Sequence, residues 1–546
     1  MPSWRQRAYD ELPALSVRRG ELRRSLRIVT WGYIFALLWM ACCSASHLIV
    51  FTRMLGFRDI HFGMLTAIAY VAALGQLVAA VLVERTGLKK FQFIHCASVA
   101  RLLWLAVAAL PLVLPIPSPW AVYAMLLILL GSSFMSSLAT PVWFTWMGDL
   151  IPKRIRGRYL GYRTRAGALV RLPFVIVLGL VLDLVSKPGA PQERSAQPVL
   201  FWTTCAIFAL GAVFGTIDIL LFHRIRDVIP TSKGPIAASQ PPKTPGLREL
   251  LVQPLQDRVF RHYVLYGIAI TFAVSVGGSF YWLNAMENLG FSKLAVNVVF
   301  LVISPIAGLL SAKGWGRLID SWGRRPALIL ATIGTVFSIS HWFFLTRYTP
   351  APPLLADAAN WLACRVGPLV GRPEWVWIHP ETPLGAYLVA CLFAVIGGVA
   401  WTGVTMAQTG VMFGFSDVQG RTKYVAATAV LLGVGGTLGA LCGGVVASLL
   451  APLQDHRIGP FLWNNWHAVF LLSLLARFAS LSFLVHMPDP GSRRVRHLVR
   501  AMRGNVYNVI APRFLYPLRI FGFGRRSRGK QPTDAPEDED QFKPPG

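Results

Sequence analysis

Few residues of this sequence are suited to chemistry, and the clearest are ionisable side chains inside long apolar stretches, where charge is rare and usually functional. Arg171 lies near the middle of one such stretch. We expect it either to bind an anionic group or to pair with Asp149, Asp183 or a backbone carbonyl. The sequence shows no metal-ligand cluster, nucleophile motif or phosphate-binding loop. These features indicate binding rather than catalysis, so we expect neither an enzyme nor a cofactor or metal.

A short basic motif between two apolar stretches is the second informative group, Gly316-Arg-Leu-Ile-Asp320-Ser-Trp-Gly323-Arg324-Arg325-Pro326. Gly316 allows a neighbouring helix to approach closely, and Asp320 places a carboxylate at the edge of the apolar region. Gly323 permits a turn with positive φ. The two arginines favour a position on the inner side of a membrane. The motif therefore predicts a tight cytoplasmic hairpin between two membrane helices.

The hairpin motif has a weaker copy upstream, which indicates a duplicated architecture. The corresponding residues are Ala80, Glu84, Arg85, Gly87, Lys89 and Lys90. Two further basic loops also correspond: one carries Arg156 and Arg158 after the fourth apolar stretch, and the other carries Arg421 after the tenth.

The composition is that of a membrane protein. The 546 residues are 54% hydrophobic and only 14% charged, with a mean hydropathy of +0.52. A soluble chain of this size would carry more charge. The net charge of +28 is concentrated in one alternating set of loops and tails, which is the positive-inside pattern. It therefore predicts a bacterial plasma-membrane protein with both termini in the cytoplasm, and it argues against binding of nucleic acid.

Twelve apolar segments are long enough to span a bilayer as helices. They fall at roughly 27–55, 60–83, 92–115, 119–147, 159–185, 198–223, 260–287, 294–319, 326–346, 384–413, 423–452 and 463–487. The basic, then apolar, beginning resembles a signal peptide, but the apolar run is long and helical segments follow, which favours an uncleaved first helix. We predict an all-α polytopic protein with a cytoplasmic segment 1–26, a six-helix half 27–223, a linker 224–259, a second half 260–487 and a tail 488–546.

The connecting segments leave alternatives open. The linker ends in an amphipathic piece, Leu247–Leu251, that either lies on the inner membrane face or is only part of a tether. The external loop 347–383, with Trp361, Trp375 and Trp377, is interpreted as an interfacial anchor rather than a lid. The basic part of the tail should lie on anionic inner-leaflet lipid.

With twelve helices in two halves, a long middle linker and the Gly-x-x-x-Asp-x-x-Gly-Arg-Arg motif, the sequence resembles the major facilitator superfamily (MFS) of secondary transporters. The resemblance covers about residues 25–490. It implies two six-helix halves related by a pseudo-two-fold axis, and alternating access around a midplane site. It also implies transport of a small-molecule solute, by uniport, antiport or proton-coupled symport, in a protein that we expect to be a monomer.

The same resemblance implies gating roles for the two motifs. Asp320 is expected to meet the start of the fifth helix near Arg156 and Arg158, and Glu84 the start of the eleventh near Arg421. A carboxylate is favoured at a helix N-terminus by the helix dipole. Such contacts would lock the outward-facing state. The first-half motif departs from the pattern because Glu84 and Ala80 replace the usual Asp and Gly.

In this family the first helix of each three-helix repeat lines the cavity, which gives a list of candidates. Those in the first half are Trp39, Ser46, His47, Thr140 and Trp143, and those in the second half are Ser279, Trp282, Asn284, Thr405 and Gln408. Aromatic, hydroxyl and amide groups suit a neutral, polyhydroxylated or amphipathic solute. The alternative for each is helix packing, because Ser and Thr often bridge packed helices.

The same helix assignment predicts the roles of the charged and titratable residues. Arg101 and Arg477 fall on the third and twelfth helices, which face away from the cavity, so pairing within the protein is favoured for both, as it is for Asp218. His47 is the central candidate for a proton switch, with a packing role favoured. Two other classes of function stay open: a membrane sensor or assembly protein without flux, and a transporter of lipid-linked substrates.

Overall fold

The computed structural model describes residues 19–86, 89–187, 191, 193–225, 252–366, 382–414, 421–453, 456–458 and 461–488. All of them lie in one compact unit of the chain, residues 1–492. Several predicted features fall outside the described residues: the segment before residue 19, the amphipathic piece of the linker, Gly87, Trp375, Trp377 and the tail from residue 489. The same holds for the side chains of Glu84, Arg85, Asp149 and Arg421.

In the described part of the chain, twelve helices are long and apolar enough to cross a membrane, as predicted. The first half contains α2 (Arg19–Cys42), α3 (Ser46–Leu55), α4 (Asp59–Ala72), α5 (Gly75–Thr86), α6 (Lys89–Val113), α7 (Pro119–Leu150), α8 (Lys153–Val185) and α9 (Pro198–His223). Here α2 provides the first span, which ends at Cys42 before α3, and α4 with the start of α5 provides the second. The chain is thus an all-α membrane protein.

The second half begins with the short η1 (Gln253–Gln256) and contains six further spans. Its elements are α11 (Arg258–Gly277), α12 (Phe280–Leu283), η2 (Asn284–Asn288), α13 (Lys293–Asn297), η3 (Val298–Ile303), α14 (Ser304–Trp322), α15 (Arg324–Ser340), η4 (His341–Phe343), α16 (Pro353–Val366), α17 (Leu384–Gly414), α18 (Arg421–Leu449), η6 (Ala451–Leu453), β1 (His456–Ile458), β2 (Phe461–Trp463) and α19 (Asn465–Val485). The two strands pair antiparallel.

The first predicted span, 27–55, is interrupted rather than continuous. The break follows Cys42, and Ala45 there has a φ of 80°. Backbone groups freed inside a membrane need partners, and side chains supply them: Ser46 N donates to Asn297 Oδ1 at 3.1 Å, and His47 Nε2 lies 2.6 Å from the Cys42 carbonyl oxygen. The break therefore depends on a contact with the other half of the protein, which a local sequence pattern does not reveal.

The seventh and eighth spans are irregular as well. The seventh breaks after Gly277 and ends in the π-helical turn η2, and the eighth contains the π-helical turn η3. Pro305 is the second residue after η3 and lacks the N–H that would continue an α-helical ladder, which accounts for the wider turn. Helices interrupted at the middle of the membrane are a common feature of transporter binding sites.

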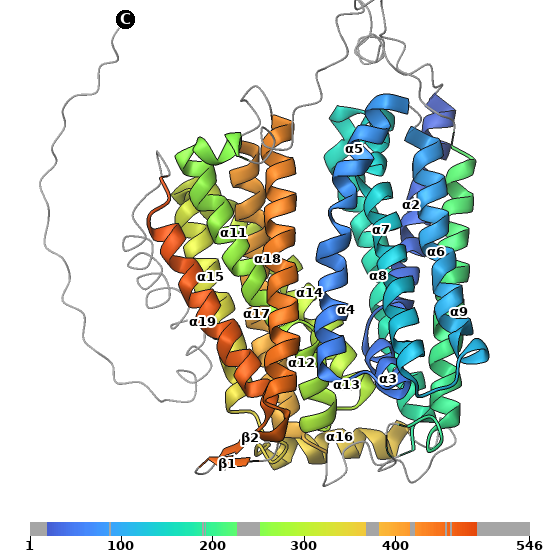
Figure 1. Cartoon of the computed structure of the whole chain (residues 1–546), viewed down its shortest axis with the longest axis vertical. Helices are drawn as coiled ribbons and strands as arrows, with labels where there is room; N and C mark the ends of the chain where they lie inside the picture. Colours follow the sequence, from blue (N-terminus) through green and yellow to red (C-terminus); the bar gives the residue numbers. More distant parts are fainter. Residues whose placement is uncertain are drawn as a thin grey trace, which may run out of the picture. The chain divides into compact units, whose positions relative to one another are not determined.

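We call the end of the bundle that carries the loops α5–α6, α7–α8 and α14–α15 the basic end, and the other the opposite end. Figure 1 shows the two halves side by side, with α4 next to α18. Their contact is close because it is made by glycines: a Cβ on Gly63 would lie 2.7 Å from the Ala440 carbonyl oxygen and from Gly444 Cα. Gly179 of α8 lies against Leu294 in the same way.

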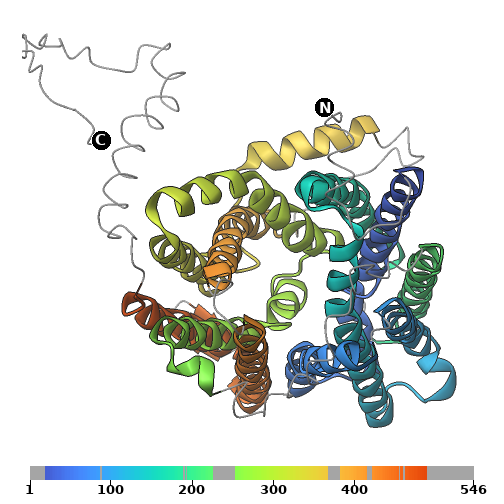
Figure 2. The ribbon, with the colours of Figure 1, turned by 90° about the horizontal axis from the view of Figure 1, so that it is seen from above.

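The apolar core follows the same division. The largest cluster of buried side chains joins both halves, with Phe51 and Phe201 from the first and Phe280 and Phe470 from the second. A separate cluster around Trp146 belongs to the first half alone. The helix α16 lies across the opposite end, roughly perpendicular to the spanning helices (Figures 1 and 2).

Candidate binding site

A cavity of about 810 Å³ lies within the first half, bounded mainly by α2, α6, α7 and α9. Its wall combines aromatic rings with hydroxyl groups and few charges. The aromatic residues are Tyr33, Trp39, Phe93, Trp104, Trp143, Phe144 and Phe222; the hydroxyl-bearing ones are Ser44, Ser132, Ser133, Ser136, Ser137 and Thr140; and the charged ones are Arg101, Arg163 and Asp218. The volume and the mainly apolar wall are typical of a small-molecule site.

A buried ion pair forms part of this wall. Arg101 Nη2 on α6 lies 3.2 Å from Asp218 Oδ2 on α9, and the two side chains are 10% and 3% exposed. The guanidinium carbon of Arg101 also lies 4.3 Å from the ring centroid of Trp39. Any side chain at Gly215 would overlap Arg101 Cγ, so the glycine makes room for the pair. The predicted pairing of Arg101 within the protein is present. The prediction that its helix faces away from the cavity is wrong, because α6 lines this cavity with Phe93, Arg101 and Trp104.

A second arginine, Arg163 of α8, lines the cavity without an acidic partner among the described residues. Its guanidinium carbon lies 4.3 Å from the ring centroid of Tyr33 and 4.8 Å from that of Trp143. The residue is only 9% exposed, and its Nε and Nη1 atoms are buried with no hydrogen-bond partner in the part of the chain that the structure describes. The sequence does not single out Arg163, because it lies close to the start of the predicted segment 159–185, just after the basic run from Lys153 to Arg158.

Three of the predicted candidates meet in this cavity: Trp39, Thr140 and Trp143. Trp39 stacks on Arg101 and Trp143 on Arg163. The hydroxyl of Thr140 donates to the Ser136 carbonyl oxygen at 2.8 Å, while the residue itself is exposed. These side chains come from the first and fourth spans, as the family resemblance implied.

Ser46 and His47 lie elsewhere, at the break between α2 and α3. Both are fully buried. The His47 ring packs 5.4 Å from that of Phe208 and contacts the Cys42 carbonyl. Neither residue lines the cavity, and His47 stabilises the helix break.

The candidates on the seventh span lie where the two halves touch or in the core. Ser279 Oγ is 2.9 Å from Thr66 Oγ1 of the first half. Trp282 packs on Phe300 with ring centroids 4.8 Å apart. Asn284 is fully buried, and its Oδ1 accepts from Asn288 Nδ2 at 3.0 Å.

The tenth span carries Thr405, which is exposed, and Gln408, which is partly buried. Neither lines a smaller pocket of about 200 Å³ in the second half, whose wall includes Tyr281, Trp401 and Arg477. Arg477 donates to the Thr335 carbonyl oxygen at 3.0 Å and to the Tyr281 hydroxyl at 3.4 Å. This arginine is therefore held by neutral acceptors within its own half.

Arg171 on α8, the sequence-based candidate for binding an anion, is partly buried, and its Nε has no hydrogen-bond partner among the residues described. It does not line the cavity of the first half. One of its predicted partners is used elsewhere: the Asp183 carboxylate accepts from the backbone N–H groups of Lys293 and Leu294 at 2.8 and 2.9 Å. Asp183 thus joins the two halves at the N-terminus of α13.

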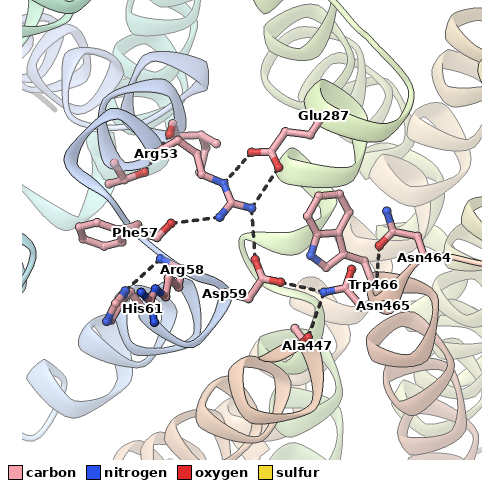
Figure 3. A network of polar contacts seen from close by, with 12 residues as sticks. Arg53, Phe57, Arg58, Asp59, His61, Glu287, Ala447, Asn464, Asn465 and Trp466 are labelled. Carbon is pink, nitrogen blue, oxygen red and sulfur yellow. Dashed lines mark hydrogen bonds and ion pairs between the residues drawn. The ribbon is translucent and has the colours of Figure 1, made fainter. Parts of the chain in front are cut away.

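A polar network ties the halves together at the opposite end (Figure 3). Arg53 donates from Nε and Nη2 to the two carboxylate oxygens of Glu287, at 2.6 and 3.0 Å. The same Nη2 lies 3.1 Å from Asp59 Oδ1, and Asp59 Oδ2 accepts from Asn465 Nδ2 at 2.8 Å. Two residues from each half therefore form one connected set of charge-assisted hydrogen bonds.

For Asp320, Arg156 and Arg158, predicted gating residues at the basic end, no such connection is found among the described residues. Asp320 is exposed, and no ion pair or hydrogen bond of its carboxylate is found within the described part of the chain. Arg156 donates to the carbonyl oxygens of Gly148 and Ile151 in its own half, and Arg158 is exposed.

Arg325 and Lys90 of the two hairpin motifs make hydrogen bonds within their own halves. Arg325 donates to the carbonyl oxygens of Leu484 and Val485, and Arg324 is exposed. Lys90 donates to the carbonyl oxygens of His223 and Ile225, at 3.1 and 2.7 Å. Gly323 has a φ of 99°, as a turn glycine requires.

The chain matches the family model of the Major Facilitator Superfamily over residues 32–362, and it belongs to that family. Its members are transporters, which fits the twelve spans and the cavity. No curated protein matches the sequence significantly.

Solved structures of the same fold are only distantly similar in sequence. The D-xylose-proton symporter superposes with a TM-score of 0.55 at 13% identity, covering 85% of this chain and 98% of that one. The nucleoside transporter NupG gives 0.52 at 13% identity, with 86% and 98% covered. A bacterial homolog of the human lysosomal transporter Spinster gives 0.51 at 14% identity, with 86% and 96% covered.

Proposed function

We propose that this protein is a secondary transporter that carries a small solute across the membrane by alternating access. The solute site is the cavity of the first half, which is the observation that carries the proposal. It is large enough for a small molecule, and two of the spans that line it, the first and the fourth, are ones that the family resemblance assigns to binding. Its charged and polar groups come from several helices of the first half, so the site depends on how these helices pack.

The conformer is inward-facing if the basic loops are cytoplasmic, as the positive-inside pattern predicts. The ties between the halves described above lie at the opposite end, which is then external: Arg53–Glu287, Asp59–Asn465 and Asp183 with the start of α13. Asp320 at the basic end is exposed. Outward opening requires these external contacts to break and those of the hairpin motifs to form.

The cavity wall favours a solute with both polar and apolar surface. Indole and phenol rings provide flat apolar contacts with a polar edge, and the hydroxyl groups of α7 provide hydrogen bonds. The solved neighbours include a nucleoside transporter and a D-xylose-proton symporter. At 13% identity they support the fold alone, so the class of solute must come from the lining residues of this chain.

The test is a ligand screen followed by flux. Purified protein is screened for solutes that raise its melting temperature, because binding to the native state stabilises it, and each hit is then assayed for uptake into proteoliposomes with and without a pH gradient. Trp143→Ala should abolish both effects. Trp120→Ala is the matched control, since Trp120 lies on the same helix but is 76% exposed and does not line the cavity. Binding without flux would support the sensor alternative and refute transport.

A further inference from the structure

Arg163 is the least satisfied charge in the cavity wall. It is 9% exposed, it has no ion pair with any described residue, and two of its three nitrogens are buried without a hydrogen-bond acceptor in the same part of the chain. Taking a guanidinium out of water without a partner is strongly unfavourable. Arg101 in the same wall has its carboxylate, Asp218, and Arg477 has two oxygen acceptors. Arg163 differs from both, because no described residue plays that role for it.

The two rings beside Arg163 hold its guanidinium in place without satisfying its donors. Tyr33 and Trp143 lie 4.3 and 4.8 Å from the guanidinium carbon, and cation–π contacts of this kind stabilise the charge. A ring face attracts the cation but does not accept hydrogen bonds in the plane of the guanidinium. The N–H groups are therefore left for a planar acceptor, and a carboxylate or phosphate matches their fork geometry.

The balance of charge in the wall points the same way. Its charged members are Arg101, Arg163 and Asp218, so the wall carries one positive charge more than negative. Asp218 is already engaged by Arg101 at 3.2 Å. A low-dielectric cavity with a single excess charge concentrates ligands of the opposite sign.

The side chain of Arg163 does not extend to the surface of the protein. At 1.5 Å per residue it lies about 15 Å of helical rise beyond Lys153, the first residue of α8. A basic side chain near a helix end can extend to water, but the low exposure of Arg163 shows that this one does not.

The geometry points to an organic anion as the solute of this cavity. Its carboxylate, phosphate or sulfonate would bind Arg163, and its apolar body would lie against Trp39, Trp104 and Trp143. This inference rests on the proposed function, because it assigns a substrate class to the same cavity. It also differs from the neutral solute that the candidate residues of the sequence suggested.

A first test needs no ligand. Arg163→Gln removes an unpaired buried charge, so the melting temperature of the ligand-free protein should rise or stay unchanged. If Arg163 were only a structural clamp between α2, α7 and α8, the melting temperature should fall, and that result would overturn the inference. Arg165→Gln is the matched control, because Arg165 lies on the same helix with the same charge but is exposed.

The second test uses matched pairs of probes that differ in one anionic group: benzoate and benzamide, glucose 6-phosphate and glucose, uridine monophosphate and uridine. In at least one pair the anion should raise the melting temperature of the native protein more than its neutral partner does. Arg163→Gln should weaken that binding about tenfold to a hundredfold, the effect of losing hydrogen bonds to a charged group. Arg163→Lys should retain part of it, and Arg165→Gln all of it.

The two levels of the proposal fail differently. If a neutral probe binds and is transported equally well by the native protein and by Arg163→Gln, the anion assignment is wrong while transport stands. If an anion binds through Arg163 but no proteoliposome flux follows, the site is correct and transport is wrong. If no anion in the panel binds in preference to its neutral partner, the anion assignment is also wrong.

Discussion

Neutralising Glu287 should shift the protein toward the conformer in which the opposite end opens. The Arg53–Glu287 pair joins the two halves through two charge-assisted hydrogen bonds of 2.6 and 3.0 Å. Glu287→Gln keeps the shape of the side chain and removes its charge. Because Arg53 belongs to the first half and Glu287 to the second, the substitution destabilises only conformers in which the halves meet at this end.

The size of the shift follows from how exposed the pair is. The side chains of Arg53 and Glu287 are 19% and 28% exposed, so the pair lies between a fully solvated and a fully buried one. Surface pairs contribute up to about 1 kcal/mol, and hydrogen bonds to charged groups about 1.5–3 kcal/mol. A loss of about 1–2 kcal/mol corresponds to a change of roughly fivefold to thirtyfold in the ratio of the two conformers.

The assay measures a distance across the opposite end by paired spin labels. Positions 120 and 348 suit it, because Trp120 in the first half and Tyr348 in the second are 76% and 90% exposed. The labels are introduced as cysteines after replacement of the seven native ones. Glu287→Gln should increase the longer-distance population, and Arg58→Gln, at an exposed arginine of the adjacent loop, should not. Identical distance distributions for the native protein and Glu287→Gln would refute the reasoning.

Three further predictions concern other contacts. Asp218→Asn leaves Arg101 buried without a counterion and should lower the free energy of unfolding, measured by denaturant titration, by about 3 kcal/mol. The double variant Arg101→Met with Asp218→Leu should recover most of this loss. A double variant no more stable than Asp218→Asn would contradict the prediction. Gly63→Ala should push α4 away from α18, because its Cβ would lie 2.7 Å from the Ala440 carbonyl oxygen. The distance between the spin labels should therefore increase. Gly131→Ala is the control that should leave this distance unchanged, because its Cβ would lie at an ordinary 3.5 Å from Leu103. Asp320→Asn should favour the inward-facing conformer, since its proposed latch forms only in the other; unchanged flux together with an unchanged distance distribution would rule the latch out.

The sequence predicted the spans well because each is a long apolar run whose length is set by the bilayer. The predicted segments at 119–147 and 198–223 correspond to α7 and α9, for example. It could not predict the break after Cys42, since Asn297, which accepts from Ser46 N there, lies far along the chain. Nor could it predict the irregular seventh span, whose Ser279 contacts Thr66 of the first half.

The candidate site was accessible from the sequence only in part. Trp39, Thr140 and Trp143 could be predicted because the family resemblance assigns their helices to the cavity. Among the residues of those helices, large polar or aromatic side chains were the natural candidates. His47 and Asn284 satisfied the same rule, but they lie in the core, because the rule names a helix and not the face that a residue occupies. The sequence does not distinguish Arg163 from the arginines of the basic loop that precedes it.

The sequence by itself determined the class of fold, the number of spans and, through the position of its basic loops, the orientation that we propose. These properties depend on the hydrophobicity and charge of each segment, which can be read from that segment of the sequence alone. Only the tertiary structure decided which charges have partners. Arg101 and Asp218 are separated along the chain and adjacent in space, whereas the described neighbours of the Arg163 guanidinium are the rings of Tyr33 and Trp143. Whether a buried charge is paired depends on contacts between helices, and that distinction is what turns Arg163 into a candidate for binding the solute.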